Sequence, residues 1–108
     1  MDILKIKQQK LIKMLPPLDK IIRGTFRKYY LTCGTKSCRC HHGGKKHGPY
    51  AYLGITDKGK TIMRRVPKEI ETEVKGGVRL YDRLWRVIIQ LCEVNRRLIW
   101  RRAERKQH

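Results

Sequence analysis

The sequence predicts a small α+β protein in which helices flank a three-stranded antiparallel sheet, with a metal-binding loop between the first two strands. Three observations indicate this fold. Apolar residues recur at helical spacing near both ends of the chain, three segments between them are rich in β-branched and aromatic residues, and a glycine-rich loop carries clustered cysteines and histidines. A chain of 108 residues supports one domain with a small core, so a bound metal ion would add needed stability.

The first predicted element is a helix over residues 2–15, which ends at Pro16-Pro17 because proline disfavours helical backbone in the residue before it. Its lysines lie on one side, and its apolar residues lean to the other: Ile3, Leu4, Leu11, Ile12 and Leu15.

Three strands are predicted next, over residues 25–32, 50–55 and 60–66. A loop over residues 33–48 joins the first two strands. Residues 56–59 form a hairpin turn between the second and third strands, in which Gly59 is free to take a positive φ.

Pro67 is expected to open a short helix, since its missing N–H costs nothing in the first helical turn. Gly76-Gly77 predicts a break, and a long basic helix is expected from residue 78 to about 105. We expect one domain made of three segments: a helix over 1–17, the loop and sheet with the start of the next helix over 18–75, and the long helix over 76–108.

The long helix has apolar residues at heptad spacing. Two interpretations stay open: a short homodimer seam in which a polar Asn95 fixes the register, or a wide stripe that packs on the rest of the same chain. The seam residues would be Leu84, Ile88, Leu91, Asn95 and Leu98.

The charge is strongly unbalanced, with 27 Lys and Arg against 9 Asp and Glu and a net charge of +18. Such a chain is expected to bind a polyanion, and nucleic acid is the usual one. No apolar run reaches the length of about 20 residues that spans a bilayer, and no signal peptide or myristoylation glycine is evident, so we expect no membrane attachment. The expected location is the cytoplasm, in association with the nucleoid or a ribonucleoprotein.

The cysteine and histidine loop predicts a structural metal site. Three thiols within eight residues followed by a histidine suit one tetrahedral Zn²⁺ per chain, held by Cys33, Cys38, Cys40 and His47. His41 or His42 is an alternative fourth ligand. We expect no catalytic residue and no enzyme activity, because no carboxylate lies between Asp19 and Asp57 to serve a metal-dependent hydrolase.

This loop also carries a family resemblance. The stretch from Cys33 to Cys40 (CGTKSCRC), followed by His47-Gly48-Pro49-Tyr50-Ala51-Tyr52-Leu53, resembles a family of short uncharacterised prokaryotic and phage proteins. That family has the pattern Cys-Gly-Lys-Pro-x-Cys-x-Cys, a basic glycine loop and His-Gly-Pro-Tyr-x-Tyr-Leu. Its members occur near transposases and other mobile elements, so the resemblance implies a role in such a system. It also implies the same four ligands. Thr35-Lys36 stands where the family has Lys-Pro.

Nucleic-acid contacts are expected on three surfaces: the strands, the metal loop and the last turns of the long helix. The residues are Arg27, Lys28, Lys36, Arg39, Lys45, Lys46, Tyr50, Tyr52, Arg64, Arg65, Arg97, Arg101 and Arg105. Duplex DNA is favoured because a sheet followed by a helix is a known DNA reader, and structured RNA is the alternative. A protein-interaction adaptor, with a protein partner from the same system, and a metal-dependent nuclease are further alternatives.

Overall fold

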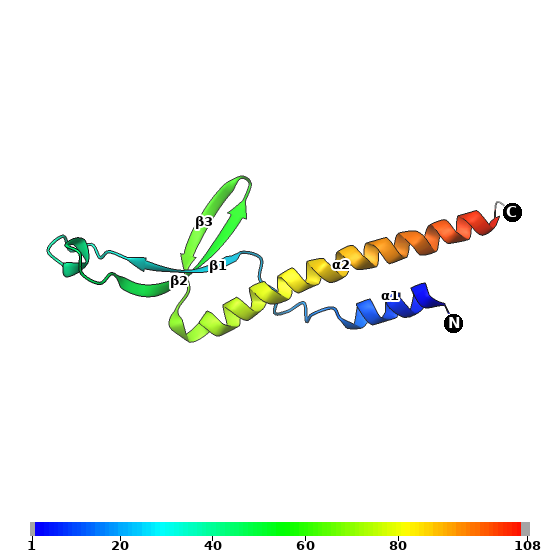
Figure 1. Ribbon diagram of the computed structural model, residues 1–108, viewed down its shortest axis with the longest axis horizontal. Coiled ribbons are helices and arrows are strands. Elements are labelled where there is room, and N and C mark those ends of the chain that lie inside the picture. Colours follow the sequence, from blue (N-terminus) through cyan, green and yellow to red (C-terminus); the bar gives the residue numbers. More distant parts are fainter. Residues whose placement is uncertain (1, 107–108) are drawn as a thin grey trace. The chain divides into compact units, whose positions relative to one another are not determined.

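The computed structural model describes residues 2–106, and within them the order of elements confirms the predicted α+β architecture (Figure 1). The elements are α1 (Ile3–Lys13), β1 (Thr25–Leu31), the 3₁₀ turn η1 (Arg39–His41), β2 (His47–Asp57), β3 (Lys60–Arg65), the 3₁₀ turn η2 (Lys68–Ile70) and α2 (Glu71–Lys106). They divide into two compact units. The sheet unit comprises residues 22–78, and the helical unit comprises residues 2–21 and 79–106. That all segments make up one domain stays a prediction.

The sheet unit is built on an antiparallel sheet of order β1-β2-β3. The β2–β3 turn has positive φ at Lys58 (50°) and Gly59 (78°), as a two-residue hairpin turn that matches the twist of its strands requires. β2 begins at His47, earlier than predicted, and pairs with the end of β1 through Leu31 and His47. The register shifts between Tyr29 and Leu31, so a bulge precedes the metal loop.

The register sorts the side chains of the sheet onto two faces. One face carries Arg27, Tyr29, Tyr50, Tyr52 and Arg65, which we call the Arg-Tyr face. The other face carries Phe26, Lys28, Ala51, Leu53 and Arg64, and Ala51 is buried. Lys28 on this second face forms an ion pair with Glu71, the first residue of α2, at 3.4 Å between Nζ and Oε2. This face, which also carries the aliphatic residues of β2, therefore lies toward the start of α2.

The expected break at Gly76-Gly77 is wrong, because α2 continues through both glycines as one helix. Two glycines inside a helix cost roughly 1 kcal/mol each relative to alanine. A compensating contact is present: the backbone N–H of Ile22 donates to the carbonyl oxygen of Gly77 at 3.0 Å, and Gly77 is buried. Gly77 thus lies at a buried contact inside the helix rather than at a helix end.

The helical unit consists of α1 packed antiparallel on the distal part of α2. Its core contains Leu11, Val87 and Val94, with Leu91 and Leu98 packed against them. Polar contacts continue the same interface: Gln8 donates from Nε2 to Oδ1 of Asn95 at 2.7 Å. The expected α1 face is only partly right, because Ile3, Ile12 and Leu15 are exposed while Leu11 is buried.

The expected homodimer seam is used within the chain over its distal half. Leu91 and Leu98 pack on the α1–α2 core, and Asn95 binds Gln8, so these positions already have partners on α1. Leu84 and Ile88 are half-buried. Over the second half of the seam, the apolar stripe of α2 therefore packs on the same chain, as the second interpretation predicts.

Cys92 lies on α2 and is exposed. None of the described helices is both long and apolar enough to cross a membrane.

Candidate metal centre and basic surfaces

The metal loop joins β1 to β2 and is closed by short-range backbone hydrogen bonds. The Cys38 N–H donates to the Thr35 carbonyl at 3.0 Å, and the His41 N–H donates to the Cys38 carbonyl at 3.0 Å, which forms η1. The Gly44 N–H then donates to the Arg39 carbonyl at 2.7 Å. These turns fold the loop back so that residues on either side of it meet.

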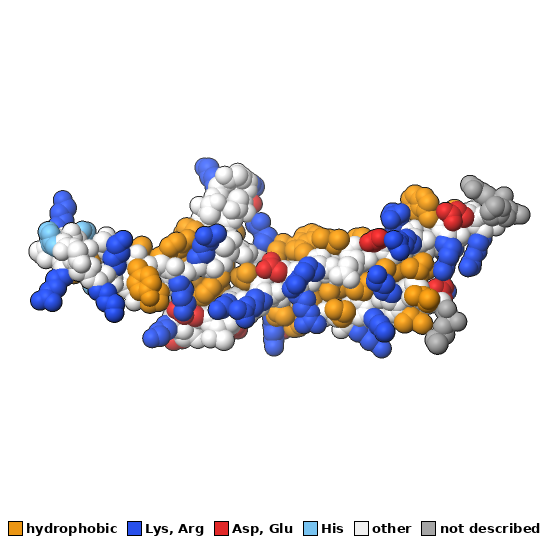
Figure 2. Space-filling model, in the orientation of Figure 1, with side chains coloured by type: hydrophobic (Ala, Val, Ile, Leu, Met, Phe, Trp, Pro, Cys, Tyr) orange, Lys and Arg blue, Asp and Glu red, His pale blue; other side chains and the backbone are white. Residues whose placement is uncertain are grey.

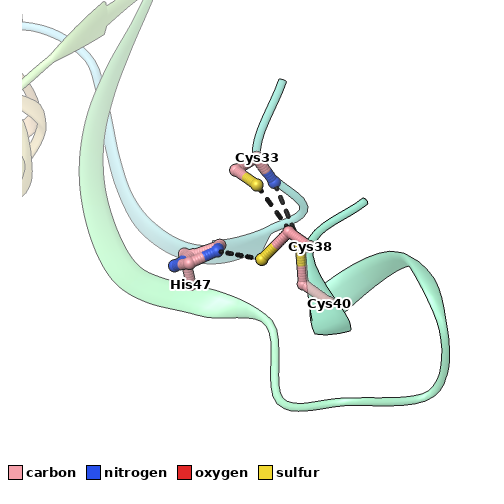
Figure 3. Close-up of side chains that lie close together, drawn as sticks. All are labelled: Cys33, Cys38, Cys40 and His47. Carbon is pink, nitrogen blue, oxygen red and sulfur yellow. Dashed lines mark hydrogen bonds between the residues drawn. The ribbon is translucent and has the colours of Figure 1, made fainter. Parts of the chain in front are cut away.

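Four side chains converge where the loop closes, and they could hold a metal ion (Figure 3). Cys33 follows β1, Cys38 precedes η1, Cys40 lies within η1, and His47 begins β2. The three sulfur atoms and one His47 ring nitrogen all lie within 4.8 Å of one another. Cys33 Sγ and Cys40 Sγ are 3.6 Å apart, and Cys38 Sγ is 3.4 Å from His47 Nε2. These are the four residues predicted from spacing.

The alternative ligands His41 and His42 do not belong to this cluster. His41 Nε2 lies 2.6 Å from the Cys33 carbonyl oxygen, and His42 Nε2 lies 3.2 Å from the Lys36 carbonyl oxygen. Each ring is therefore placed to donate to a backbone oxygen that would otherwise lack a partner in the loop. Both histidines support the loop rather than the metal.

The thiols differ in acidity because their surroundings differ. The pKa of Cys38 is lowered to about 6, first by a hydrogen bond from the Cys40 backbone N–H and then by the His47 ring and the neighbouring thiols. The Cys33 backbone N–H, 3.3 Å from Cys40 Sγ, lowers the pKa of Cys40, but burial and the two adjacent thiols outweigh it and raise that pKa. Thiolates are the metal-binding form of cysteine, so the cluster contains one thiol that ionises readily.

Gly44 is the glycine that this loop requires. A Cβ added there would stand 2.5 Å from the Arg39 carbonyl oxygen and 2.7 Å from the Arg39 Cβ. By contrast, nothing lies within 4 Å of a Cβ added at Gly34. The turn that brings His47 back toward the cysteines therefore depends on Gly44.

The cations of the loop are exposed. They are Lys36, Arg39, Lys45 and Lys46, and none of them forms an ion pair with an acidic side chain of residues 2–106. Figure 2 shows Lys and Arg side chains standing around the histidines of this loop. The loop therefore presents uncompensated positive charge around the cluster.

The Arg-Tyr face combines aromatic rings with cations. Tyr29 and Tyr52 contact each other with ring centroids 5.8 Å apart and planes tilted by 60°. The guanidinium carbon of Arg65 lies 3.9 Å from the centroid of the Tyr50 ring, a cation–π contact. Arg27 and Arg65 are exposed, whereas Tyr50 and Tyr52 are half-buried. Tyr50 and Tyr52 share this face because alternate residues of a strand point to the same side of the sheet.

Three of the cations expected to contact nucleic acid are already paired with carboxylates of this chain. Lys28 pairs with Glu71, Arg97 pairs with Glu93 one helical turn away at 3.0 Å, and Arg101 makes two hydrogen bonds to the Asp2 carboxylate at 2.7 and 3.2 Å. Arg101 is also only 30% exposed. The expected arginine row on α2 is therefore not a row of free cations: only Arg105 in it is exposed without a carboxylate partner among residues 2–106.

The fold and the cluster define a small α+β protein with a Cys₃His group in a hairpin loop. The chain belongs to the family described as a domain of unknown function (DUF6788), whose family model matches residues 1–76. All four cluster residues and the whole sheet lie inside this match. Comparisons with curated proteins and with solved structures found no match.

Proposed function

We propose that this protein is a non-catalytic nucleic-acid-binding protein, stabilised by one structural Zn²⁺, whose target is duplex DNA. The observation that carries the proposal is the uncompensated positive charge of the sheet unit. No acidic residue lies between Asp19 and Asp57, and the loop cations within this segment are exposed and unpaired with the described carboxylates. Phosphates are the ligands that such a surface neutralises, with release of counterions.

The assignment of zinc rests on the donor set and its spacing. Zinc prefers four nitrogen and sulfur ligands, and metal–sulfur bonds of about 2.3 Å in a tetrahedron put two sulfurs about 3.8 Å apart and a sulfur and a nitrogen about 3.6 Å apart. The Cys33–Cys40 and Cys38–His47 separations of 3.6 and 3.4 Å are close to these values. Four protein donors leave no open position for substrate, which favours a structural ion over a catalytic one.

Duplex DNA is proposed ahead of structured RNA because a sheet followed by a helix can lay strands against a groove. The resemblance to proteins found near mobile elements supports an accessory role in such a system. The rival classes are an adaptor that binds a protein partner and a metal-dependent nuclease.

The deciding experiment measures binding of the purified protein to a DNA duplex and to an RNA hairpin over a range of salt concentrations. We expect tight duplex binding at low salt and a steep linear fall of log K with log salt. Nucleic acid that co-purifies should be degraded by deoxyribonuclease and resist ribonuclease. The reverse sensitivity supports RNA, a protein partner retained at high salt supports the adaptor, and magnesium-dependent cleavage that survives His47→Ala contradicts the non-catalytic proposal.

A further inference from the structure

A cavity of about 500 Å³ lies in the sheet unit beside the start of α2. Its walls come from three elements and the segment between two of them: Tyr50 and Ala51 on β2, Arg65 at the end of β3 with Val66 and Pro67 after it, and Lys68 on η2. Lys28, Glu71 and the segment from Gly48 to Pro49 complete the lining. The volume falls in the range of small-molecule sites, and apolar and cationic groups share the walls.

The charges in this cavity are distributed unequally. Lys28 is paired with Glu71 at 3.4 Å, so their charges offset each other. Arg65 and Lys68 have no carboxylate partner among the described residues, and both are exposed. Two available cations therefore stand beside a cavity whose lining also contains aromatic and aliphatic residues.

The Arg65 guanidinium already lies over the Tyr50 ring at 3.9 Å, which fixes one of its faces against the protein. The opposite face of a planar guanidinium can stack on a nucleobase. The Tyr50 ring beneath Arg65 holds the guanidinium in place for such a contact. A flat aromatic ligand next to Arg65, with an anionic group near Lys68, satisfies both features. A nucleotide combines a flat base with a phosphate in this way.

We propose that this cavity receives one unpaired nucleotide of a DNA duplex, at an overhang or branch, with its base stacked on Arg65 and its phosphate near Lys68. An unpaired base leaves the stack at the lowest energetic cost and can then present its face to a protein side chain. This inference rests on the proposed binding of duplex DNA and adds a preference for duplexes that carry an unpaired nucleotide.

The test compares two DNA probes, a short blunt duplex and the same duplex with a single unpaired terminal nucleotide, by fluorescence anisotropy at fixed salt. Stacking of one base predicts that the overhang probe binds at least about fivefold more tightly. Arg65→Lys keeps the charge and removes the planar group, so it should abolish this preference.

Arg64→Lys is the matched control, because Arg64 neighbours Arg65 but lies on the opposite face of the sheet, paired with Leu53. It should keep the preference, and both variants should keep the metal content of the unaltered protein as a check on folding. Equal affinity of the unaltered protein for the two probes overturns the inference and leaves the proposed function standing. Loss of the preference in both variants also overturns it, and binding to neither probe overturns both proposals.

Discussion

The Asp2 carboxylate accepts two hydrogen bonds from the Arg101 guanidinium, which lies 99 positions further along the chain. The same carboxylate accepts from the Lys5 backbone N–H at 3.4 Å and so caps α1. The arginine and the capping N–H groups lower the pKa of Asp2 from 3.8 to about 2, and the carboxylate raises that of Arg101. One side chain thus starts α1 and ties it to the far end of α2.

The stability supplied by this pair should depend on pH. Because the folded pKa of Asp2 lies below its ordinary value, its contribution is fully present above about pH 5 and is lost as the pH falls from 3.8 through about 2. Asp2→Asn keeps a capping side chain but removes the charge. The difference in thermal midpoint between the unaltered protein and Asp2→Asn, followed by circular dichroism, should be constant near neutral pH and fall to a small part of that value by about pH 2. A difference that persists unchanged at that pH contradicts the pairing.

Leu11 should be the residue that holds α1 to α2. Leu11→Ala removes a side chain that is 4% exposed and is expected to lower the unfolding free energy of the helical unit by about 2–5 kcal/mol. Its neighbour Ile12 is 44% exposed, so Ile12→Ala should cost less than about 1 kcal/mol. Denaturant titration of both variants measures the difference. Equal costs would mean that α1 packs through another face.

Metal binding should depend on His47 and not on the two histidines inside the loop. The purified protein is expected to contain about one Zn²⁺ per chain. His47→Ala removes a direct ligand, so the affinity should fall by more than the about 10- to 100-fold that follows loss of an outer partner. His41→Ala and His42→Ala should keep the stoichiometry. Competition with a chromophoric chelator gives the affinities, and full retention of zinc affinity by His47→Ala would refute the ligand assignment.

Gly44→Ala should impair the same site without touching a ligand. The added Cβ would meet the Arg39 carbonyl oxygen at 2.5 Å, and overpacking of this kind costs roughly 1–3 kcal/mol. Zinc affinity is therefore expected to fall about 5- to 100-fold in the chelator assay. Gly34→Ala, which meets nothing within 4 Å, is the matched control and should bind like the unaltered protein. An equal loss in both variants would point to backbone flexibility instead of the close approach.

The loop cations should set the salt dependence of DNA binding. Replacing Lys45 and Lys46 together by glutamine should weaken binding and reduce the slope of log K against log salt by about 2, since each phosphate contact contributes about 0.9. Arg97→Gln is the comparison, because Arg97 is already paired with Glu93, and its slope should change little. Anisotropy titrations at several salt concentrations supply both slopes. A slope that is unaffected by the lysine replacements would place the phosphate contacts elsewhere.

The Cys₃His cluster and the β2–β3 hairpin could be predicted because their determinants are local. Cys33, Cys38, Cys40 and His47 lie within one loop, where spacing and glycine content limit the geometry, and Gly59 marks its turn directly. The continuity of α2 could not be predicted, since it depends on Ile22 binding the Gly77 carbonyl from a distant part of the chain.

The burial of apolar residues along the helices was equally hard to predict. The sequence of α1 offers several apolar positions, and the antiparallel packing against α2 selects Leu11 while leaving Ile3 and Ile12 exposed. The same packing takes Asn95 and Arg101 out of the roles that their heptad and i, i+4 spacing indicated. Spacing within one helix identifies which residues share a face, but a partner element decides what that face does.

The pairing of Leu31 with His47 would give a bound metal ion a role in strand alignment. The connection between β1 and β2 is long, and closing a loop of that length carries an entropic cost. An ion bound to Cys33 and His47 would clamp the two strands at that end in one alignment. A slip by a single residue would move Tyr50 and Tyr52 to the opposite side of the sheet. Chelation or thiol oxidation would therefore erase the Arg-Tyr face without altering any residue that belongs to it.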